Sequence, residues 1–127
     1  MARWLFKQEP ESYSFADLVR EGRTTWDGVG NALARSHLRS VKVGDCAFFY
    51  ETGKVKAIVG EMRIVEAGEA PVVEAVAALP RPVSLSEIKG VAELAEWELV
   101  RLPRLSVMPT SVAQWRLVEK LARVEQK

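Results

Sequence analysis

The stretch W-L-F-K-Q-E-P at residues 4–10, together with W-D-G-V-G-N at residues 26–31, is the most informative part of this chain. Each stretch places an indole within a few residues of charged or amide side chains. A tryptophan with hydrogen-bonding neighbours usually contacts something besides the core of a small domain. Neither stretch contains a nucleophile beside a base, or a cluster of metal ligands. A flat apolar surface edged by donors and acceptors suits a planar polar ring, so we expect binding rather than bond-breaking.

Length and composition predict one domain with its own core. The chain has 127 residues, of which 48% are hydrophobic, and we expect a single domain over residues 1–127. Its one cysteine, Cys46, lies in an apolar run, where we expect a buried thiol without a disulfide partner. The only histidine, His37, excludes a His–His zinc site, and we expect neither a metal nor another cofactor.

Charge and hydropathy restrict the partners of the chain. No apolar run approaches the ~20 residues of a membrane-spanning helix, and no charged leader precedes an apolar stretch. We therefore expect a cytoplasmic, monomeric protein that does not enter membranes. A net charge of +1 and a pI of about 7.9 exclude a strongly cationic nucleic-acid coat. Any contact with nucleic acid must then use a local patch of the surface.

Apolar runs bounded by turn residues predict five strands. Proline ends three of these runs, at Pro10, Pro80 and Pro109, because it cannot donate to a ladder. Gly60 interrupts the longest run and marks a bulge or a sharp bend. We expect the strands over residues 3–7, 46–50, 55–66, 72–79 and 105–108.

Capping signals predict the helices between and after these strands. A serine followed three residues later by an acid or amide begins three of them, at Ser14–Asp17, Ser84–Glu87 and Ser111–Gln114. A further helix is expected over about 31–40, and a helical turn carrying Trp97 over 91–99. Short strands with small helices between them predict an α+β fold. A compact barrel is the expected arrangement, because closure removes exposed strand edges.

Four candidate residues of the two tryptophan motifs could either contact a ligand or serve the fold. Trp26 stands in a loop with no periodicity to bury it, and we expect it to face a pocket. Trp4 begins a strand, where a buried position and a pocket position agree equally with the sequence. Asp27 either reads a ligand or satisfies amides of its own turn, and Asn31 either reads a ligand or caps the following helix.

The remaining candidates are charged or lie at a strand end. Lys7 and Glu9 either face the same concavity or form an ordinary surface ion pair. Tyr50 ends a strand beside a glycine turn, where it either packs or lines the mouth of a barrel. Arg35 and Arg39 are one helical turn apart and are candidates for contact with a phosphate backbone. Motifs such as G-x-S-x-G and the phosphate-binding loop are absent from the sequence, and we expect no enzymatic activity.

Five sequence motifs resemble those of the EVE domain family and follow one another in the same order. They are W-L-F-K-Q-E-P at 4–10, W-D-G-V-G-N at 26–31, V-G-D-C-A-F-F-Y at 43–50, L-P-R-P-V-S-L at 79–85 and R-L-S-V-M-P at 104–109. The resemblance implies a PUA-like fold, a small curved β-barrel with flanking short helices. It also implies a pocket for a modified nucleobase of DNA or RNA. Carried over motif by motif, the base-binding candidates are Trp4, Lys7, Glu9, Trp26, Asp27, Val29, Asn31, Tyr50 and Ser106.

The chain also departs from the family pattern. Gln8 stands where the family usually has serine, and Gly30 stands where it usually has arginine, so a donor that could meet phosphate is missing. After Tyr50 the chain continues with Glu51-Thr52-Gly53 instead of a His-Ser-Asn type of turn. A carboxylate at that position would repel phosphate or favour a different base edge. The segment between residues 64 and 79 is shorter than usual.

The sequence therefore supports two hypotheses. In the first, a non-enzymatic module accepts an extruded base between Trp26 and Tyr50, while Asp27 and Asn31 read its polar edge. Arg35 and Arg39 would hold the flanking phosphates. A single-stranded or already flipped base is preferred, because flipping a paired base costs a few kcal/mol. The alternative is a binder of a free nucleoside or another planar small molecule, without nucleic acid.

Overall fold

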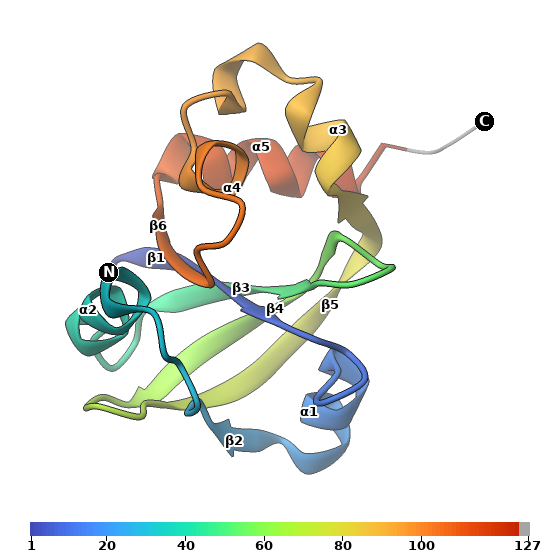
Figure 1. The fold of residues 1–127 in the computed structure, drawn as a ribbon. Helices are drawn as coiled ribbons and strands as arrows, with labels where there is room; N and C mark the ends of the chain where they lie inside the picture. Colours follow the sequence, from blue (N-terminus) through green and yellow to red (C-terminus); the bar gives the residue numbers. More distant parts are fainter. Residues whose placement is uncertain (125–127) are drawn as a thin grey trace.

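The computed structural model describes residues 1–124, and its strands form one curled, six-stranded mixed sheet (Figure 1). The strand order is β2-β5-β4-β3-β1-β6. β1 runs parallel to β3, and every other neighbouring pair is antiparallel. The expected α+β, PUA-like fold is confirmed. The strands are β1 (Arg3–Gln8), β2 (Arg23–Thr25), β3 (Cys46–Glu51), β4 (Ala57–Glu66), β5 (Val72–Ser84) and β6 (Val107–Thr110).

Helices cover both sides of the sheet. In Figure 1, α3, α4 and α5 lie above it, whereas α1 lies below it beside β2. All three serine capping signals form complete capping boxes, at the starts of α1, α3 and α5. The helices are α1 (Phe15–Glu21), α2 (Ala32–Ser40), α3 (Leu85–Lys89), the 3-10 turn η1 (Ala92–Leu94), α4 (Glu98–Arg101) and α5 (Val112–Ala122).

Two strands pass through prolines that were expected to end them. β5 continues beyond Pro80 and Pro82. Its regular pairing with β4 is interrupted between Ala78 and Val83. Both prolines lie in this irregular part of the strand, where no backbone N–H is needed for the ladder. Between the prolines, Arg81 donates from both terminal nitrogens to Glu87, at 2.6 and 2.9 Å. This ion pair lowers the pKa of Glu87 to about 2. β6 likewise includes Pro109, which an edge strand tolerates.

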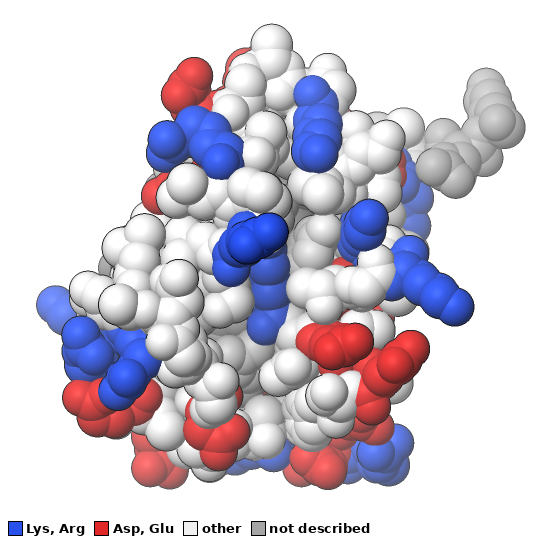
Figure 2. All heavy atoms as spheres, viewed as in Figure 1, with Lys and Arg blue, Asp and Glu red and all other residues white. Residues whose placement is uncertain are grey.

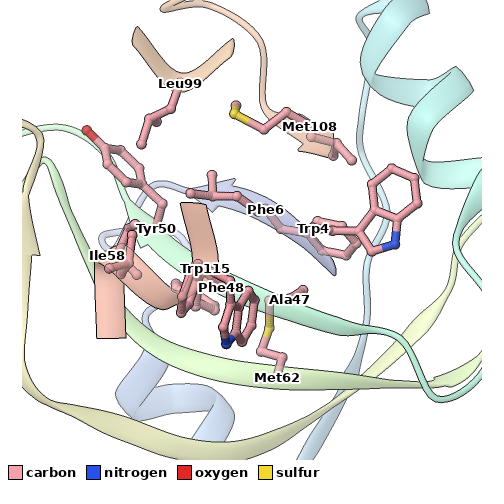
Figure 3. Close-up of a cluster of buried hydrophobic side chains, with 14 of the residues drawn as sticks. Trp4, Phe6, Ala47, Phe48, Tyr50, Ile58, Met62, Leu99, Met108 and Trp115 are labelled. Carbon is pink, nitrogen blue, oxygen red and sulfur yellow. The ribbon is translucent and has the colours of Figure 1, made fainter. Parts of the chain in front are cut away.

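Aromatic side chains fill the core on both faces of the sheet. On the side of α5, Phe48 stacks on Trp115 with ring centroids 3.7 Å apart (Figure 3). On the opposite side, Phe49 meets Phe15 edge-on at 5.4 Å. Trp97, at the start of α4, is fully buried and donates its indole N–H to the carbonyl oxygen of Pro109. Large rings thus hold α1, α4 and α5 to the sheet, and burial of such rings dominates core energetics.

Gly60 lies directly against Phe15, the first residue of α1. A Cβ built on Gly60 would lie 2.3 Å from Cζ of Phe15, so only glycine leaves room for that ring. The ladder between β4 and its neighbours is also irregular here, with register shifts beside Gly60 and between Phe49 and Tyr50. The expected bulge at Gly60 is confirmed, and its reason is a close packing contact.

Candidate functional site

The alternation of β1 sends the side chains of the first tryptophan motif to two different faces. Along the parallel pairing with β3, Phe6 lies opposite Phe49, and the next residue, Lys7, lies opposite Tyr50. Paired residues of neighbouring strands share a face, and successive residues alternate between faces. The Phe6 face packs on the loop that follows β2. The Lys7 face is turned toward α3, α4 and the loop before β6.

Trp26 lies in the core on the Phe6 face. Its ring centroid is 5.2 Å from that of Phe6 and 5.6 Å from that of Phe49, and only 3% of the residue is exposed. Its backbone N–H donates to the carbonyl oxygen of Pro71. The expectation of an open stacking wall is therefore wrong for Trp26. Tertiary packing buries a loop residue that has no periodic pattern of its own, and Trp26 and Tyr50 do not face one another across a pocket.

Trp4 is also a core residue, anchored by a buried carboxylate. Its indole N–H donates to Oδ2 of Asp45 at 2.9 Å, and Asp45 also accepts from the backbone amides of Ala2 and Lys42. Burial alone would raise the pKa of Asp45, but the three hydrogen bonds outweigh it and lower the pKa. His37 packs beside the indole, with ring centroids 6.2 Å apart. Of the two positions open to Trp4 from sequence, the structure selects the buried one.

The loop between Trp26 and α2 carries three of the expected site residues. Asn31 caps α2, since its side-chain oxygen accepts from the backbone N–H of Ala34 at 2.9 Å. The interpretation of Asn31 as the cap of this helix is confirmed. Val29 is half-buried against the core. Asp27 is exposed, and no hydrogen bond to another residue of the described chain holds its carboxylate.

Lys7 and Tyr50 are adjacent on the opposite face. The ammonium of Lys7 donates to the carbonyl oxygen of Pro103 at 2.9 Å and lies 5.4 Å from the centre of the Tyr50 ring. Burial lowers the pKa of Lys7 and raises the pKa of Tyr50 to about 12. Figure 3 shows the Tyr50 hydroxyl at the margin of the core cluster, directed away from it. Lys7 thus does not form the alternative surface pair with Glu9.

Two further candidates contribute through their backbone. Glu9 is exposed, and its carbonyl oxygen accepts from the amides of Ser12 and Tyr13, which closes the turn after β1. The carbonyl oxygen of Ser106 accepts from the amide of Lys7 at 2.8 Å. This bond continues the pairing of β1 with the chain just before β6. It holds the loop that supplies Pro103 beside Lys7.

Three adjoining hollows open on the Lys7 face. The Asn31 cavity, of about 320 Å³, is lined by Asn31, Leu33 and residues 101–105. The lysine cavity, of about 300 Å³, shares Pro103 with it and is lined by Lys7, Tyr50, Thr52, Gly53, Lys56, Leu85, Lys89, Leu99 and Pro103. The Lys54 hollow, of about 460 Å³, shares Lys56, Leu85 and Lys89 with the lysine cavity and adds Lys54, Val55, Ser84 and Ser86.

The linings of these hollows include six cations and no carboxylate. We call the six the basic surface; they are Lys7, Lys54, Lys56, Lys89, Arg101 and Arg104. Figure 2 shows lysine and arginine side chains gathered across the middle of this face, while most acidic side chains lie along its lower part. Although the net charge of the chain is only +1, its cations and its carboxylates are concentrated in different parts of this face. The cations form a local patch of the kind that contact with nucleic acid would need.

The basic surface differs from the cations expected from sequence. Arg35 and Arg39 are exposed on α2 and line none of the three hollows, and Arg39 lies 3.9 Å from the carboxylate of Glu69. Glu51, expected to place a carboxylate near the pocket, instead accepts from the backbone N–H of Phe15 at the start of α1. Sequence reasoning missed Lys56, Lys89 and their neighbours because the six positions are scattered over three elements (β1, α3 and α4) and two loops.

The EVE domain model matches residues 2–72 and 69–121, so the chain belongs to the EVE domain family. Human thymocyte nuclear protein 1 is 42% identical to it over 77 residues, which are 51% of this chain and 34% of that protein. The chain thus spans about a third of the length of the curated relatives it matches.

Solved structures of similar proteins cover nearly the whole chain. One from Agrobacterium tumefaciens has a TM-score of 0.93 at 28% identity, covering 100% of this chain and 97% of that one. The human THYN1 protein in complex with DNA containing 5-methylcytosine has a TM-score of 0.92 at 27% identity, covering 99% of this chain and 100% of that one.

Within residues 1–124, no three His, Cys, Asp or Glu side chains gather in a way that could hold a metal ion. Over the same part of the chain, no helix has the length and apolar character to cross a membrane.

Proposed function

We propose that this chain is a non-enzymatic module that binds nucleic acid through the basic surface and accepts a modified, extruded base. The observation that carries the proposal is the row of six cations along three adjoining hollows whose linings include no carboxylate. Phosphate contacts supply most of the affinity of such modules and release counterions. The structure of the human relative with DNA containing 5-methylcytosine supports a modified base of DNA as the ligand class.

The Asn31 cavity is the better place for the base. Leu33, Leu102 and Leu105 provide apolar walls, while Asn31 and the planar guanidinium groups of Arg101 and Arg104 supply polar edges and a stacking surface. Its volume of about 320 Å³ lies within the usual range of small-ligand pockets. Burying one methyl group against such walls stabilises a complex by about 0.8 kcal/mol. We therefore expect about a fourfold preference for 5-methylcytosine over cytosine.

Salt-dependent binding of short single-stranded oligonucleotides tests the proposal. The oligonucleotides carry cytosine or 5-methylcytosine at one position, and affinity is measured by fluorescence anisotropy from low to moderate salt. We expect Arg104→Gln to weaken binding and to reduce the slope of log affinity against log salt by about 0.7, the value for one phosphate contact with a single strand. Lys120→Gln is the matched control, because Lys120 is exposed on α5 away from the hollows.

Two outcomes would contradict the proposal. Equal slopes for the wild type, Arg104→Gln and Lys120→Gln would show that the basic surface does not contact phosphate. Binding of free 5-methyl-2′-deoxycytidine as tightly as the oligonucleotide, without salt dependence, would instead support the alternative of a binder of free nucleosides. The apolar lining of the Asn31 cavity is the observation that favours this second function.

A further inference from the structure

The lysine cavity gathers three ammonium groups from three separate elements. Lys7 comes from β1, Lys56 from the hairpin between β3 and β4, and Lys89 from the end of α3. Like charges in a small space repel one another unless an anion lies between them. Two hydroxyl groups line the same cavity: that of Tyr50 can donate to an anion, and that of Thr52 donates to the carbonyl oxygen of Gln8 at 3.5 Å. The donor set is that of a site for a small, multiply charged oxyanion.

The groups around the cavity leave Lys7 without a charged partner. Its ammonium is half-buried, and the only acceptor that the described chain provides is the neutral carbonyl oxygen of Pro103. Glu51, which follows Tyr50 in the chain, accepts from the amide of Phe15, and neither Glu51 nor Glu9 lines the cavity. Burying an ammonium without a counter-charge is unfavourable, so a bound anion would complete this site.

The backbone of Lys56 points to the same site by an independent observation. With a φ of +46°, Lys56 is the only residue other than glycine in the left-handed region among residues 1–124. Its carbonyl oxygen accepts from the amide of Leu85, which fixes the hairpin against α3. A residue with a Cβ is uncommon in this conformation, where glycine or asparagine is preferred. Unfavourable backbone conformations of this kind cluster at ligand sites.

We propose that the lysine cavity binds a phosphate monoester, the terminal phosphate of a nucleotide or of a nucleic-acid strand. The inference rests on the proposed function, since it places the phosphate one cavity away from the base, across Pro103. An internal phosphodiester carries a single negative charge, whereas a monoester carries about −1.5 to −2 at neutral pH. Three ammonium groups without a carboxylate therefore match the terminal phosphate better than an internal one.

Paired ligands with and without a terminal phosphate test the inference. The probes are a single-stranded 5-methylcytosine oligonucleotide with a 5′-phosphate, the same strand with a 5′-hydroxyl, 5-methyl-2′-deoxycytidine, and its 5′-monophosphate. We expect the 5′-phosphate to strengthen binding roughly tenfold, as a charge-assisted hydrogen bond to an ammonium group would. The mononucleotide pair separates a free nucleotide from a strand end as the source of the phosphate.

Lys56→Gly is the decisive variant, because glycine accepts the left-handed backbone without strain and removes only the side chain. We expect its melting temperature to stay at or above that of the wild type, while the gain from the 5′-phosphate disappears. Lys56→Asn, which also tolerates this conformation, should behave in the same way. Lys120→Ala, a charge removed from an exposed position of α5, should keep the full gain.

The outcomes separate this inference from the proposed function. If the 5-methylcytosine strand binds but the 5′-phosphate adds nothing, or if Lys56→Gly retains the gain, the monoester site is refuted and the proposed function stands. If the mononucleotide binds through its phosphate while no strand binds, the monoester site stands and the proposed function fails. If none of the four ligands binds, both fail.

Discussion

Replacing Gly60 by alanine tests the contact that fixes α1 to the sheet. The added Cβ would lie 2.3 Å from Cζ and 2.5 Å from both Cε atoms of Phe15. Carbon atoms prefer a separation of about 3.5–4.0 Å, so the ring or the strand must move by about 1.2 Å. The ring has little freedom to move, because Phe15 is 5% exposed, packs edge-on against Phe49 and begins a capped helix.

We expect Gly60→Ala to destabilise the fold by about 2–3 kcal/mol, in the upper part of the range for overpacked cores. For a chain of this size that corresponds to a loss of about 8–12 °C in melting temperature. Urea unfolding and thermal melts measure both quantities. Gly90→Ala is the control, because the nearest atom to its Cβ would be the carbonyl oxygen of Glu87 at 3.4 Å, an ordinary contact.

A double mutant separates this steric mechanism from a general effect of removing glycine. In Phe15→Leu the ring atoms that the new Cβ would meet are gone, so Gly60→Ala should cost much less in that background. The coupling free energy should reach at least about 1 kcal/mol, as for residues in direct contact. Strictly additive effects, or a Gly60→Ala variant that melts within about 2 °C of the wild type, would refute the reasoning.

Three further predictions concern the stability of the fold. Trp26→Ala should destabilise the protein by about 3–5 kcal/mol in urea unfolding, as the loss of a buried tryptophan does; an effect below about 1 kcal/mol would contradict its burial. Asn31→Ala should cost about 0.5–2 kcal/mol through the lost cap of α2, while Asn31→Ser should recover most of it. The pKa of Asp45 is lowered from its ordinary value of 3.8, so its stabilisation is present above about pH 4 and is lost as the pH falls through the folded pKa. Urea midpoints between pH 7 and pH 3 should therefore fall more steeply for the wild type than for Asp45→Asn.

Local signals in the sequence predicted most of the elements. The serine boxes at Ser14, Ser84 and Ser111 need only four consecutive residues to be recognised, and all three are formed. β2 was not predicted, because Arg23–Thr25 is short and polar and is a strand only through its pairing with β5. The length of β5 was missed for a related reason. Whether a proline ends a strand depends on the partner strand, which the local sequence does not show.

The candidate site was predicted less well than the fold, because a site is made of side chains from distant parts of the chain. Lys7 and Tyr50 were placed in it by their motifs, and they do line one cavity. Lys56 and Lys89 lie outside the motifs that were recognised, and only the packing of the hairpin against α3 brings them to Lys7. Trp26 is buried, although we expected it to face a pocket, because the absence of periodicity in a loop does not indicate exposure.

The two faces of β1 decide which substitutions can report on binding. Phe6 packs against Trp26, and Trp4 is buried and hydrogen-bonded to Asp45, so changing either perturbs the fold before any ligand is considered. Loss of affinity in Trp26→Ala would therefore follow from unfolding and would say nothing about a stacking contact. Arg104 and Lys56 are exposed. Their variants keep the aromatic face intact, so a change in salt slope or in the 5′-phosphate gain can be assigned to the ligand itself.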